Sequence, residues 1–222
     1  MEKLSGPELP PASGGKPKQL VIFLHGLGSN GDDLLQLAED RFSDILPDAH
    51  FISPNAPIEL PPMPTFFGFM KGYQWFDWIP DDKEEMLRQA KKSSVILDSF
   101  IDEQLERFNL EPKNLVLIGF SQGTVMSLLT GLNREKKIGG IIGYSGALLN
   151  REEFKSSPDI CLIHGTMDDV VPFTAMENAK EALQNSGVRV ETHAIEGLAH
   201  GINEEAIEAG GNFLRKVLIH RK

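Results

Sequence analysis

The sequence predicts an α/β protein in which helices cover both faces of a mostly parallel central sheet. Two observations support this fold class. Short runs that are apolar almost throughout alternate along the chain with longer stretches whose apolar residues recur at the helical period. The chain also has 222 residues, of which 41% are hydrophobic, so it holds enough apolar material for one substantial core. We therefore expect a single domain over residues 19–222.

The strand candidates are short and apolar along most of their length, as buried parallel strands are. They are residues 19–25, 49–53, 114–119, 139–144, 160–164 and 189–195. The clearest helix covers 82–108, where apolar side chains fall at alternating steps of three and four. Asp81 or Asp82 can cap its start, and Asn109 followed by Pro112 ends it. Further helices are expected at 33–42, 122–132, 173–186 and 203–220.

The first 18 residues are rich in proline and glycine, which leaves two alternatives: a loose tail or an irregular edge strand. They contain no apolar signal-peptide core, and no stretch of the chain approaches the roughly 20 apolar residues of a spanning helix. The single cysteine, Cys161, cannot form an intramolecular disulfide. We therefore expect a cytoplasmic protein with no stable membrane insertion.

The charge of the chain argues against anionic partners. Its 22 Lys and Arg residues are outnumbered by 32 Asp and Glu residues, and the formal net charge is −10. Such a chain repels phosphate backbones and anionic lipid surfaces. Nucleic-acid binding is therefore not expected.

Residues 54–80 break the alternating pattern. Repeated prolines rule out a long regular element there, yet aromatic residues crowd the same stretch. The segment either folds over the sheet edge as a satellite cluster or walls an apolar substrate pocket. The large apolar residues concerned are Phe66, Phe67, Phe69, Met70, Tyr73, Trp75, Phe76 and Trp78.

Residues 119–123 spell G-F-S-Q-G directly after a predicted strand and directly before a predicted helix. A sharp strand-to-helix turn needs small residues on either side of its serine, and it lifts the hydroxyl clear of the sheet. In this context the motif predicts that Ser121 is a nucleophile.

A serine nucleophile needs a base, and the base needs a carboxylate to orient it. In this type of sheet the order along the chain is serine, acid, histidine, each beyond the carboxyl end of a strand. Asp168 follows the strand 160–164 and His200 follows the strand 189–195. Asp168 or Asp169 could instead be a solvated acid before a helix, and His200 an ordinary loop histidine. The joint placement favours a triad of Ser121, Asp168 and His200.

Residues 26–31 match G-x-G-x-x-G after a strand, which is the pattern of a dinucleotide site. Such a site also needs an acid at the end of the next strand, but the strand 49–53 runs into P-N-A-P, and Asp48 stands at its wrong end. The same glycines allow a backbone to approach an acyl group closely. We therefore predict that the main-chain N–H groups of Leu27 and Gln122 form an oxyanion hole.

The sequence contains no metal-ligand spacing such as C-x-x-C or H-E-x-x-H, and His164 with Asp168 lacks a third ligand. Neither a catalytic metal nor another cofactor is therefore expected.

Six blocks of sequence occur in a familiar order. They are L-H-G-L-G-S-N-G at 24–31, P-N-A-P at 54–57, W-F-D at 75–77, G-F-S-Q-G at 119–123, H-G-x-x-D-x-x-V-P at 164–172 and G-x-x-H at 197–200. Together these blocks resemble the phospholipase/carboxylesterase family of α/β-hydrolases, which includes the acyl-protein thioesterases. The resemblance runs from about residue 20 to residue 218. It departs at Thr124, where relatives of the eukaryotic thioesterases often carry a second glycine, and we expect little chemical consequence.

The resemblance implies an α/β-hydrolase fold and a serine hydrolase that cleaves carboxylic esters or thioesters with an apolar acyl group. It also implies Asp168 rather than Asp169 as the acid, and Leu27 and Gln122 as oxyanion donors. The substrates it suggests are small esters or thioesters, acylated proteins or lysophospholipids. A non-catalytic binding module is the alternative. Because the family includes monomers and dimers, a homodimer stays open. The acyl contacts that the resemblance implies are Phe66, Phe67, Phe69, Met70 and Trp75.

Overall fold

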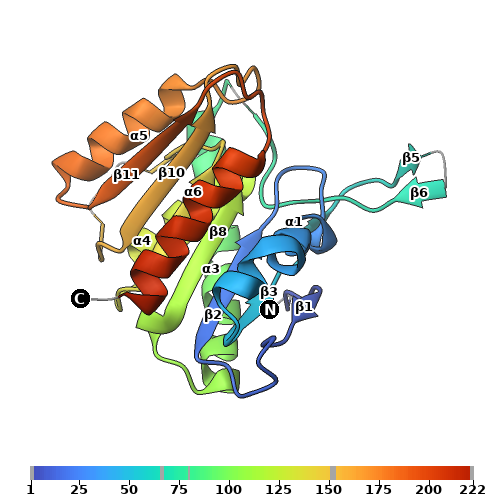
Figure 1. The fold of residues 1–222 in the computed structure, drawn as a ribbon. Helices are drawn as coiled ribbons and strands as arrows, with labels where there is room; N and C mark the ends of the chain where they lie inside the picture. Colours follow the sequence, from blue (N-terminus) through green and yellow to red (C-terminus); the bar gives the residue numbers. More distant parts are fainter. Residues whose placement is uncertain (1–2, 66–67, 80, 151–153, 221–222) are drawn as a thin grey trace.

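The computed structural model describes residues 3–65, 68–79, 81–150 and 154–220. Within them, a seven-stranded sheet has the strand order β1-β3-β2-β8-β9-β10-β11 (Figure 1). All neighbours are parallel except β1, which runs antiparallel to β3. The predicted mostly parallel sheet is thus confirmed. Its strands are β1 (Glu8–Leu9), β2 (Gln19–Leu24), β3 (Ala49–Ile52), β8 (Leu115–Phe120), β9 (Gly140–Tyr144), β10 (Asp159–Gly165) and β11 (Val190–Ile195).

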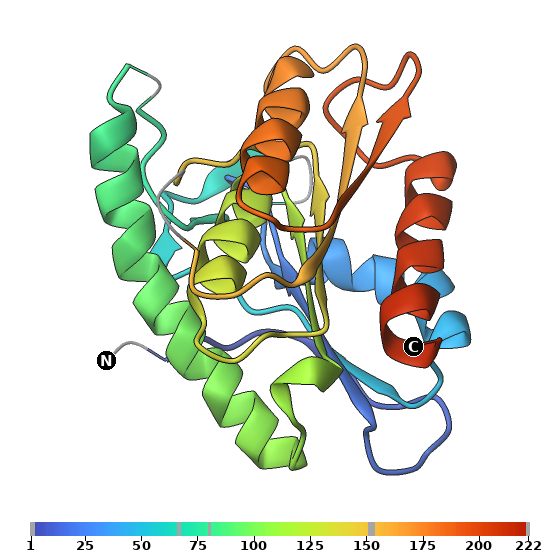
Figure 2. The same ribbon diagram turned by 90° about the vertical axis from the view of Figure 1, so that its left-hand side faces the viewer.

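Helices cover both faces of this sheet, as Figures 1 and 2 show from two directions. One face carries α3, α4 and α5, and the other carries α1 with its continuation and α6. The helical segments are α1 (Gly31–Leu37), η1 (Ala38–Phe42), α2 (Ser43–Ile45), α3 (Lys83–Phe108), η2 (Pro112–Asn114), α4 (Gln122–Asn133), α5 (Thr174–Asn185), α6 (Glu204–Leu214) and η3 (Arg215–Ile219). The last predicted helix, 203–220, therefore ends in a π-helical turn, η3.

Two cores lie on the two faces, and β2 shows how the sequence fills both. Leu20, Ile22 and Leu24 belong to the core under α3 and α4. Val21 and Phe23 belong to the core under α1 and α6. Successive side chains of a strand point to opposite faces, so a strand covered on both sides must be apolar at every position. This is why the central strands appear in the sequence as continuous apolar runs.

The long helix α3 begins and ends where its sequence signals lie. The carboxylate of Asp82, not that of Asp81, caps it by accepting a 2.9 Å hydrogen bond from the Glu85 N–H. Asn109 takes the left-handed conformation at the other end, with φ 54°. No helix among the described residues is both long enough and apolar enough to cross a membrane.

The N-terminal segment contains the edge strand β1 rather than only a loose tail. Glu8 on this strand accepts hydrogen bonds from Arg107 at 2.8 and 3.0 Å and lies 3.0 Å from the ring of His50. The Arg107 guanidinium is the largest influence on this carboxyl, and it lowers the pKa of Glu8 to about 2. An ion pair thereby joins β1 to the end of α3.

Residues 54–80 contain four short strands in two antiparallel pairs. They are β4 (Ile58–Glu59) with β7 (Tyr73–Gln74), and β5 (Met63–Thr65) with β6 (Gly68–Met70). Figure 1 shows β5 and β6 extending away from the body of the molecule. Trp75 and Phe76, in contrast, are fully buried in the core under α3. The inner end of the segment is therefore core, and its outer part is an arm.

Candidate active site

The predicted nucleophile, Ser121, lies in a strained turn between β8 and α4. Its φ of 55° and ψ of −116° are unusual for a residue other than glycine. A Cβ on Gly119 would lie 2.3 Å from the Gly123 backbone, and one on Gly123 would lie 1.7 Å from the Leu24 carbonyl oxygen. Both glycines are thus sterically required, which explains why this turn has the G-x-S-x-G pattern.

Thr124, the departure from the family pattern, packs behind the turn. Its hydroxyl lies 2.8 Å from the carbonyl oxygens of both Gly119 and Tyr144, and it can donate to either. A Cβ on Gly143 or Gly146 would meet the Thr124 side chain at 2.5 and 2.3 Å. Glycines on β9 and just beyond it therefore make room for the threonine, which packs against the turn that carries Ser121.

Asp168 is held in the loop after β10, and its side chain is fully buried. Its Oδ1 accepts hydrogen bonds from the N–H groups of Val170 at 3.0 Å and Val171 at 2.8 Å. Burial acts to raise the pKa of Asp168, but hydrogen bonds from His200 and from these N–H groups outweigh it, so the pKa lies below its usual value. The group is a carboxylate at neutral pH, while Asp169 is exposed.

Two loops bring Asp168 and His200 together. The N–H groups of Thr166 and Met167, after β10, donate to the carbonyl oxygens of Ile195, the last residue of β11, and Leu198 at 3.0 and 2.9 Å. The Gly197 N–H returns a hydrogen bond to the Thr166 hydroxyl at 2.9 Å. Because β10 and β11 are parallel neighbours, their carboxyl ends share one edge of the sheet.

His200 meets the carboxylate through Nδ1, which lies 2.9 Å from Asp168 Oδ2 and 3.1 Å from Oδ1. A carboxylate only accepts hydrogen bonds, so Nδ1 carries the proton and Nε2 is left as a base. The imidazole packs on Phe120, the residue before the serine, with ring centroids 4.8 Å apart. Among the described residues the Ser121 hydroxyl makes no hydrogen bond to the ring, although both groups line one cavity.

The loop after β2 forms the opposite side of the site. Its Gly28 has φ 82°, a conformation that favours glycine. The Gly28 N–H donates to the Tyr73 carbonyl oxygen at 2.9 Å, and the Tyr73 N–H donates to that of Ser29 at 2.8 Å. This pairing with the inner end of segment 54–80 holds the peptide group between Leu27 and Gly28, which is adjacent to the Leu27 N–H.

His25, at the start of this loop, is fully buried and has hydrogen bonds at both ring nitrogens. Nδ1 donates to the Gly26 carbonyl oxygen at 2.8 Å, because a carbonyl can only accept, and Nε2 accepts from the Ala56 N–H at 3.0 Å. Burial is the main cause that lowers the pKa of His25. A neutral imidazole thus connects the start of this loop to Ala56 through two hydrogen bonds.

The side chain of Gln122 joins the nucleophile helix to segment 54–80. It is buried, accepts a 3.1 Å hydrogen bond from the Trp75 N–H and donates a 2.9 Å hydrogen bond to the Phe76 carbonyl oxygen. The Trp75 indole N–H in turn donates to the His25 carbonyl oxygen at 3.0 Å. The two predicted oxyanion donors, Leu27 and Gln122, are therefore fixed relative to each other through one segment.

A cavity of about 810 Å³ lies between these two sides. It contains all the residues predicted for the hydrolytic chemistry except Asp168, which lies behind His200. Trp78, Phe120 and Val170 also line it. Trp78 belongs to the aromatic stretch that we expected either to wall a pocket or to pack as a cluster, whereas Phe120 and Val170 were not predicted as contacts. Its lining is Gly26, Leu27, Gly28, Ser29, Asn30, Asp32, Asp33, Gln36, Trp78, Phe120, Ser121, Gln122, Val170, Val171 and His200.

The predicted acyl contacts have different outcomes. The structure does not bring Trp75 to the cavity, because its indole fills the core and bonds to His25. Trp78, three residues further on, lines the cavity and is 48% exposed. Phe66 and Phe67 lie outside the described residues, as do the side chains of Phe69 and Met70. Prolines hide the strand periodicity here, so the sequence offers no signal to tell one tryptophan from the other.

The G-x-G-x-x-G pattern has a packing explanation. A Cβ on Gly31 would lie 1.9 Å from the Ser53 carbonyl oxygen, at the end of β3. The Gly31 N–H donates to the Asn55 side-chain oxygen at 2.8 Å, so an amide stands where a dinucleotide site has its carboxylate. These contacts favour the oxyanion interpretation of the loop.

The fold and the site together define a serine hydrolase of the α/β-hydrolase class that cleaves esters or thioesters. The model of the phospholipase/carboxylesterase family matches residues 11–218. The chain belongs to this family.

Individual relatives support this family assignment. The Dictyostelium discoideum protein "acyl-protein thioesterase 1 homolog 1" is 31% identical over 207 residues, which cover 89% of this chain and 90% of that protein. The Emericella nidulans "acyl-protein thioesterase 1" is 32% identical over 219 residues, with the same coverage of 89% and 90%. The crystal structure of esterase PE8 superposes with a TM-score of 0.87 at 36% identity and covers 97% of this chain and 100% of that one.

Proposed function

We propose that Ser121, His200 and Asp168 form a catalytic triad that hydrolyses carboxylic esters or thioesters with an apolar acyl group. The observation that carries this proposal is the pairing of His200 with a buried carboxylate, in a cavity that also holds the strained Ser121. A buried carboxylate bonded to Nδ1 leaves Nε2 as a base directed away from it, which is the arrangement that activates a serine.

In the proposed reaction, Ser121 Oγ attacks the acyl carbon and its proton passes to His200 Nε2. The negative charge on the acyl oxygen is stabilised by the N–H groups of Leu27 and Gln122, and each such donor contributes about 2.7 to 4 kcal/mol to lowering the barrier. The imidazolium then protonates the leaving alcohol or thiol, and an acyl-serine remains. Water repeats the sequence and releases the acid. The hydrogen bond between Ser121 and His200 forms in the substrate complex, where catalytic hydrogen bonds commonly tighten.

The cavity supports an apolar acyl group. Leu27, Trp78 and Val170 line it with exposed fractions of 44%, 48% and 56%. Exposed apolar side chains that gather at one opening favour an apolar ligand. We place the acyl chain along these three residues. An acylated protein is the proposed natural substrate, supported by the names of the curated relatives. Lysophospholipid is the second candidate.

Labelling with a fluorophosphonate tests the nucleophile. We expect the wild-type protein to form one adduct, which peptide mass mapping locates at Ser121, and the Ser121→Ala variant to form none. Ser127, which is buried in α4, provides the matched control variant Ser127→Ala, which should label fully. Labelling that persists in Ser121→Ala would exclude the proposed nucleophile. Absence of both labelling and turnover in the wild type would favour a binding module.

A series of p-nitrophenyl esters of increasing chain length tests the substrate class. We expect kcat/KM to rise from acetyl to octanoyl as the acyl chain covers more apolar surface. A matched pair of palmitoylated peptide and lysophosphatidylcholine then separates the two natural candidates. A rate that does not depend on chain length would exclude the apolar acyl site.

The location and the assembly of the protein stay proposals, and one rival function is also open to a direct test. We place the protein in the cytoplasm, and fractionation of cells that express it from its own promoter would test this. A homodimer is tested by light scattering during gel filtration. The rival dinucleotide function would require saturable binding of NAD or NADP, which a titration followed by calorimetry would detect.

A further inference from the structure

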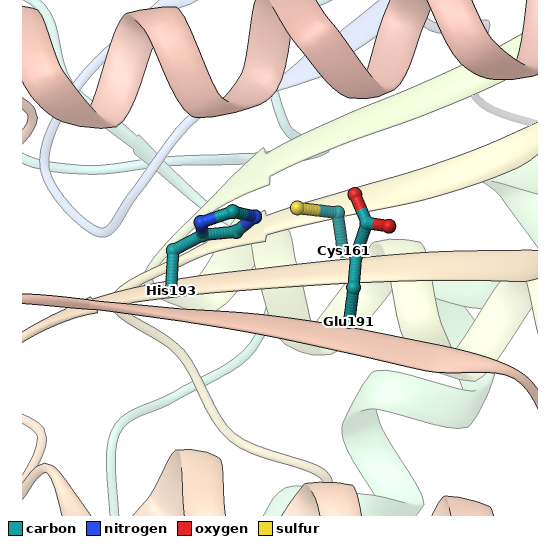
Figure 3. A group of neighbouring side chains, drawn as sticks. All are labelled: Cys161, Glu191 and His193. Atoms are coloured by element: carbon teal, nitrogen blue, oxygen red, sulfur yellow. The ribbon is translucent and has the colours of Figure 1, made fainter.

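A second group of chemically active side chains lies away from the hydrolytic cavity, between the sheet and α6 (Figure 3). Cys161 on β10 pairs in register with Glu191 on β11, and His193 stands two positions further along β11. Residues two apart on a strand share a face, so all three side chains point to the same side. One ligand atom of each lies within 4.8 Å of those of the other two.

The donor set is that of a borderline-soft cation. A thiolate, an imidazole and a carboxylate together favour zinc over magnesium or calcium, which prefer oxygen ligands. Tetrahedral zinc, with bonds of about 2.0 to 2.3 Å, holds its ligand atoms roughly 3.5 Å apart. Cys161 is fully buried and fixed, whereas Glu191 and His193 are partly exposed and can rotate to close the remaining gap.

The surroundings of the group suit a cation. The ammonium of Lys216, on η3, already pairs with the Glu191 carboxylate, so a positive charge is stabilised there. Glu191 and Lys216 also line a cavity of about 550 Å³, and their side chains are 32% and 58% exposed, so solvent reaches the group at its Glu191 end. The buried hydroxyl of Tyr144, on the next strand, has no hydrogen-bond partner among the described residues.

We propose that Cys161, Glu191 and His193 bind one zinc ion, with water as the fourth ligand and Lys216 displaced from Glu191. The thiol releases its proton to solvent as the ion binds. The site shares no lining residue with the hydrolytic cavity, so its role is structural: it ties β11, the last strand of the sheet, to β10. Motifs of closely spaced ligands do not reveal this site, because Cys161 and Glu191 are 30 residues apart in the sequence and meet only through the register of β10 with β11.

Titration with Co²⁺ tests the site, because cobalt occupies zinc sites and a thiolate ligand produces an intense charge-transfer absorption. We expect about one equivalent to bind with this absorption, and Zn²⁺ to displace it. His193→Gln should weaken the Co²⁺ affinity about tenfold or more. Cys161→Ser should abolish the charge-transfer absorption. Because Cys161 is buried and its replacement can disturb folding, His193→Gln decides the test independently.

A substitution that is expected to strengthen Co²⁺ binding distinguishes this site from non-specific binding. Lys216→Met removes the competing ammonium, so we expect it to tighten Co²⁺ binding about two- to fivefold, in line with the small contribution of an exposed ion pair. His220→Gln, which removes an exposed histidine outside the group, is the matched control and should leave the affinity unchanged. The proposal is overturned if no charge-transfer absorption appears in the wild type, or if His193→Gln and His220→Gln bind Co²⁺ equally well.

Discussion

The two sides of the cavity are built in different ways. On the side of β10 and β11, the side chains of Asp168 and His200 themselves form the site, and main-chain hydrogen bonds hold them. On the side of β2, the proposed oxyanion donors are main-chain N–H groups, and the side chains of Gln122 and His25 make hydrogen bonds to the backbone around them. The first side depends on which residues are present. The second depends on where the backbone lies.

This contrast shows why a substitution can have opposite meanings on the two sides. In the proposed triad, changing Asp168 removes the charge that faces His200. Changing Gln122 leaves its main-chain N–H in place but removes the hydrogen bonds that hold Trp75 and Phe76. Substitutions on both sides can therefore lower kcat. Only on the side of β2 should the loss of kcat go together with a loss of stability. The variants below separate these two effects.

The largest effect is expected for Asp168→Asn. The amide cannot hold the protonated Nδ1 of His200 in the tautomer that leaves Nε2 as a base, so kcat should fall about 10⁴-fold with the fold intact. Steady-state kinetics on p-nitrophenyl acetate measures this. Asp169→Asn, an exposed neighbour, is the matched control and should stay within twofold of the wild type. Equal losses in the two variants would contradict the assignment of Asp168.

Gln122→Ala tests the other side of the cavity. It leaves the Trp75 N–H and the Phe76 carbonyl oxygen unpaired in the core, at a cost of about 1–3 kcal/mol each in the free energy of unfolding. We expect kcat to fall about tenfold to a hundredfold, which is less than complete loss of an oxyanion donor, with little change in KM.

Gln89→Ala is the matched control for that variant. Gln89 holds the Asp77 N–H of the same segment through a 2.8 Å hydrogen bond, but on the exposed side, so its loss should leave kcat nearly unchanged. If Gln122→Ala lowers stability and keeps the wild-type kcat, the bridge supports the fold alone and the two sides do not differ as described.

Trp78→Ala should have a smaller and selective effect. The indole lines the cavity and is 48% exposed, so its removal should lower kcat/KM for octanoyl esters about tenfold and leave acetyl esters nearly unchanged. Val95→Ala, which removes an exposed apolar side chain on α3, is the control. A uniform loss across all chain lengths would show that Trp78 acts on the chemistry and not on the acyl chain.

The smallest effect is expected outside both sides, at the edge strand β1. The pKa of Glu8 is about 2 in the folded protein against 4.5 as the ordinary value, so the stability it contributes is complete above about 4.5 and is lost as the pH falls toward 2. Glu8→Gln should lower the Tm at neutral pH by an amount that corresponds to at most about 1 kcal/mol, because the carboxyl is partly exposed.

Thermal unfolding of both proteins across this pH range measures the difference, which should shrink as the pH falls. Glu181→Gln on α5 is the control. A difference that stays constant down to low pH would mean that the carboxylate of Glu8 is not what joins β1 to Arg107.

Some parts of the site could be predicted because their cause is local. The turn at Ser121 needs two glycines within five residues. The N-terminal cap of α3 needs an acidic residue whose carboxylate accepts a hydrogen bond from the N–H three residues later. The residues alone do not decide between Asp168 and Asp169, and it is the family resemblance that favours Asp168. In the structure the Asp168 carboxylate turns inward to His200 while Asp169 stays exposed, an orientation that depends on contacts between two loops.

The sequence by itself determined the layered architecture, the order of the strands along the chain and the type of chemistry, because hydrophobic period and turn strain are set by neighbouring residues. Only the tertiary structure decided that Trp75 fills the core while Trp78 lines the cavity, that the Gln122 side chain bonds to the backbone of Trp75, and that Cys161, Glu191 and His193 meet. Those contacts join residues that are distant along the chain, and strand register and loop closure, which no short window of sequence contains, bring them together.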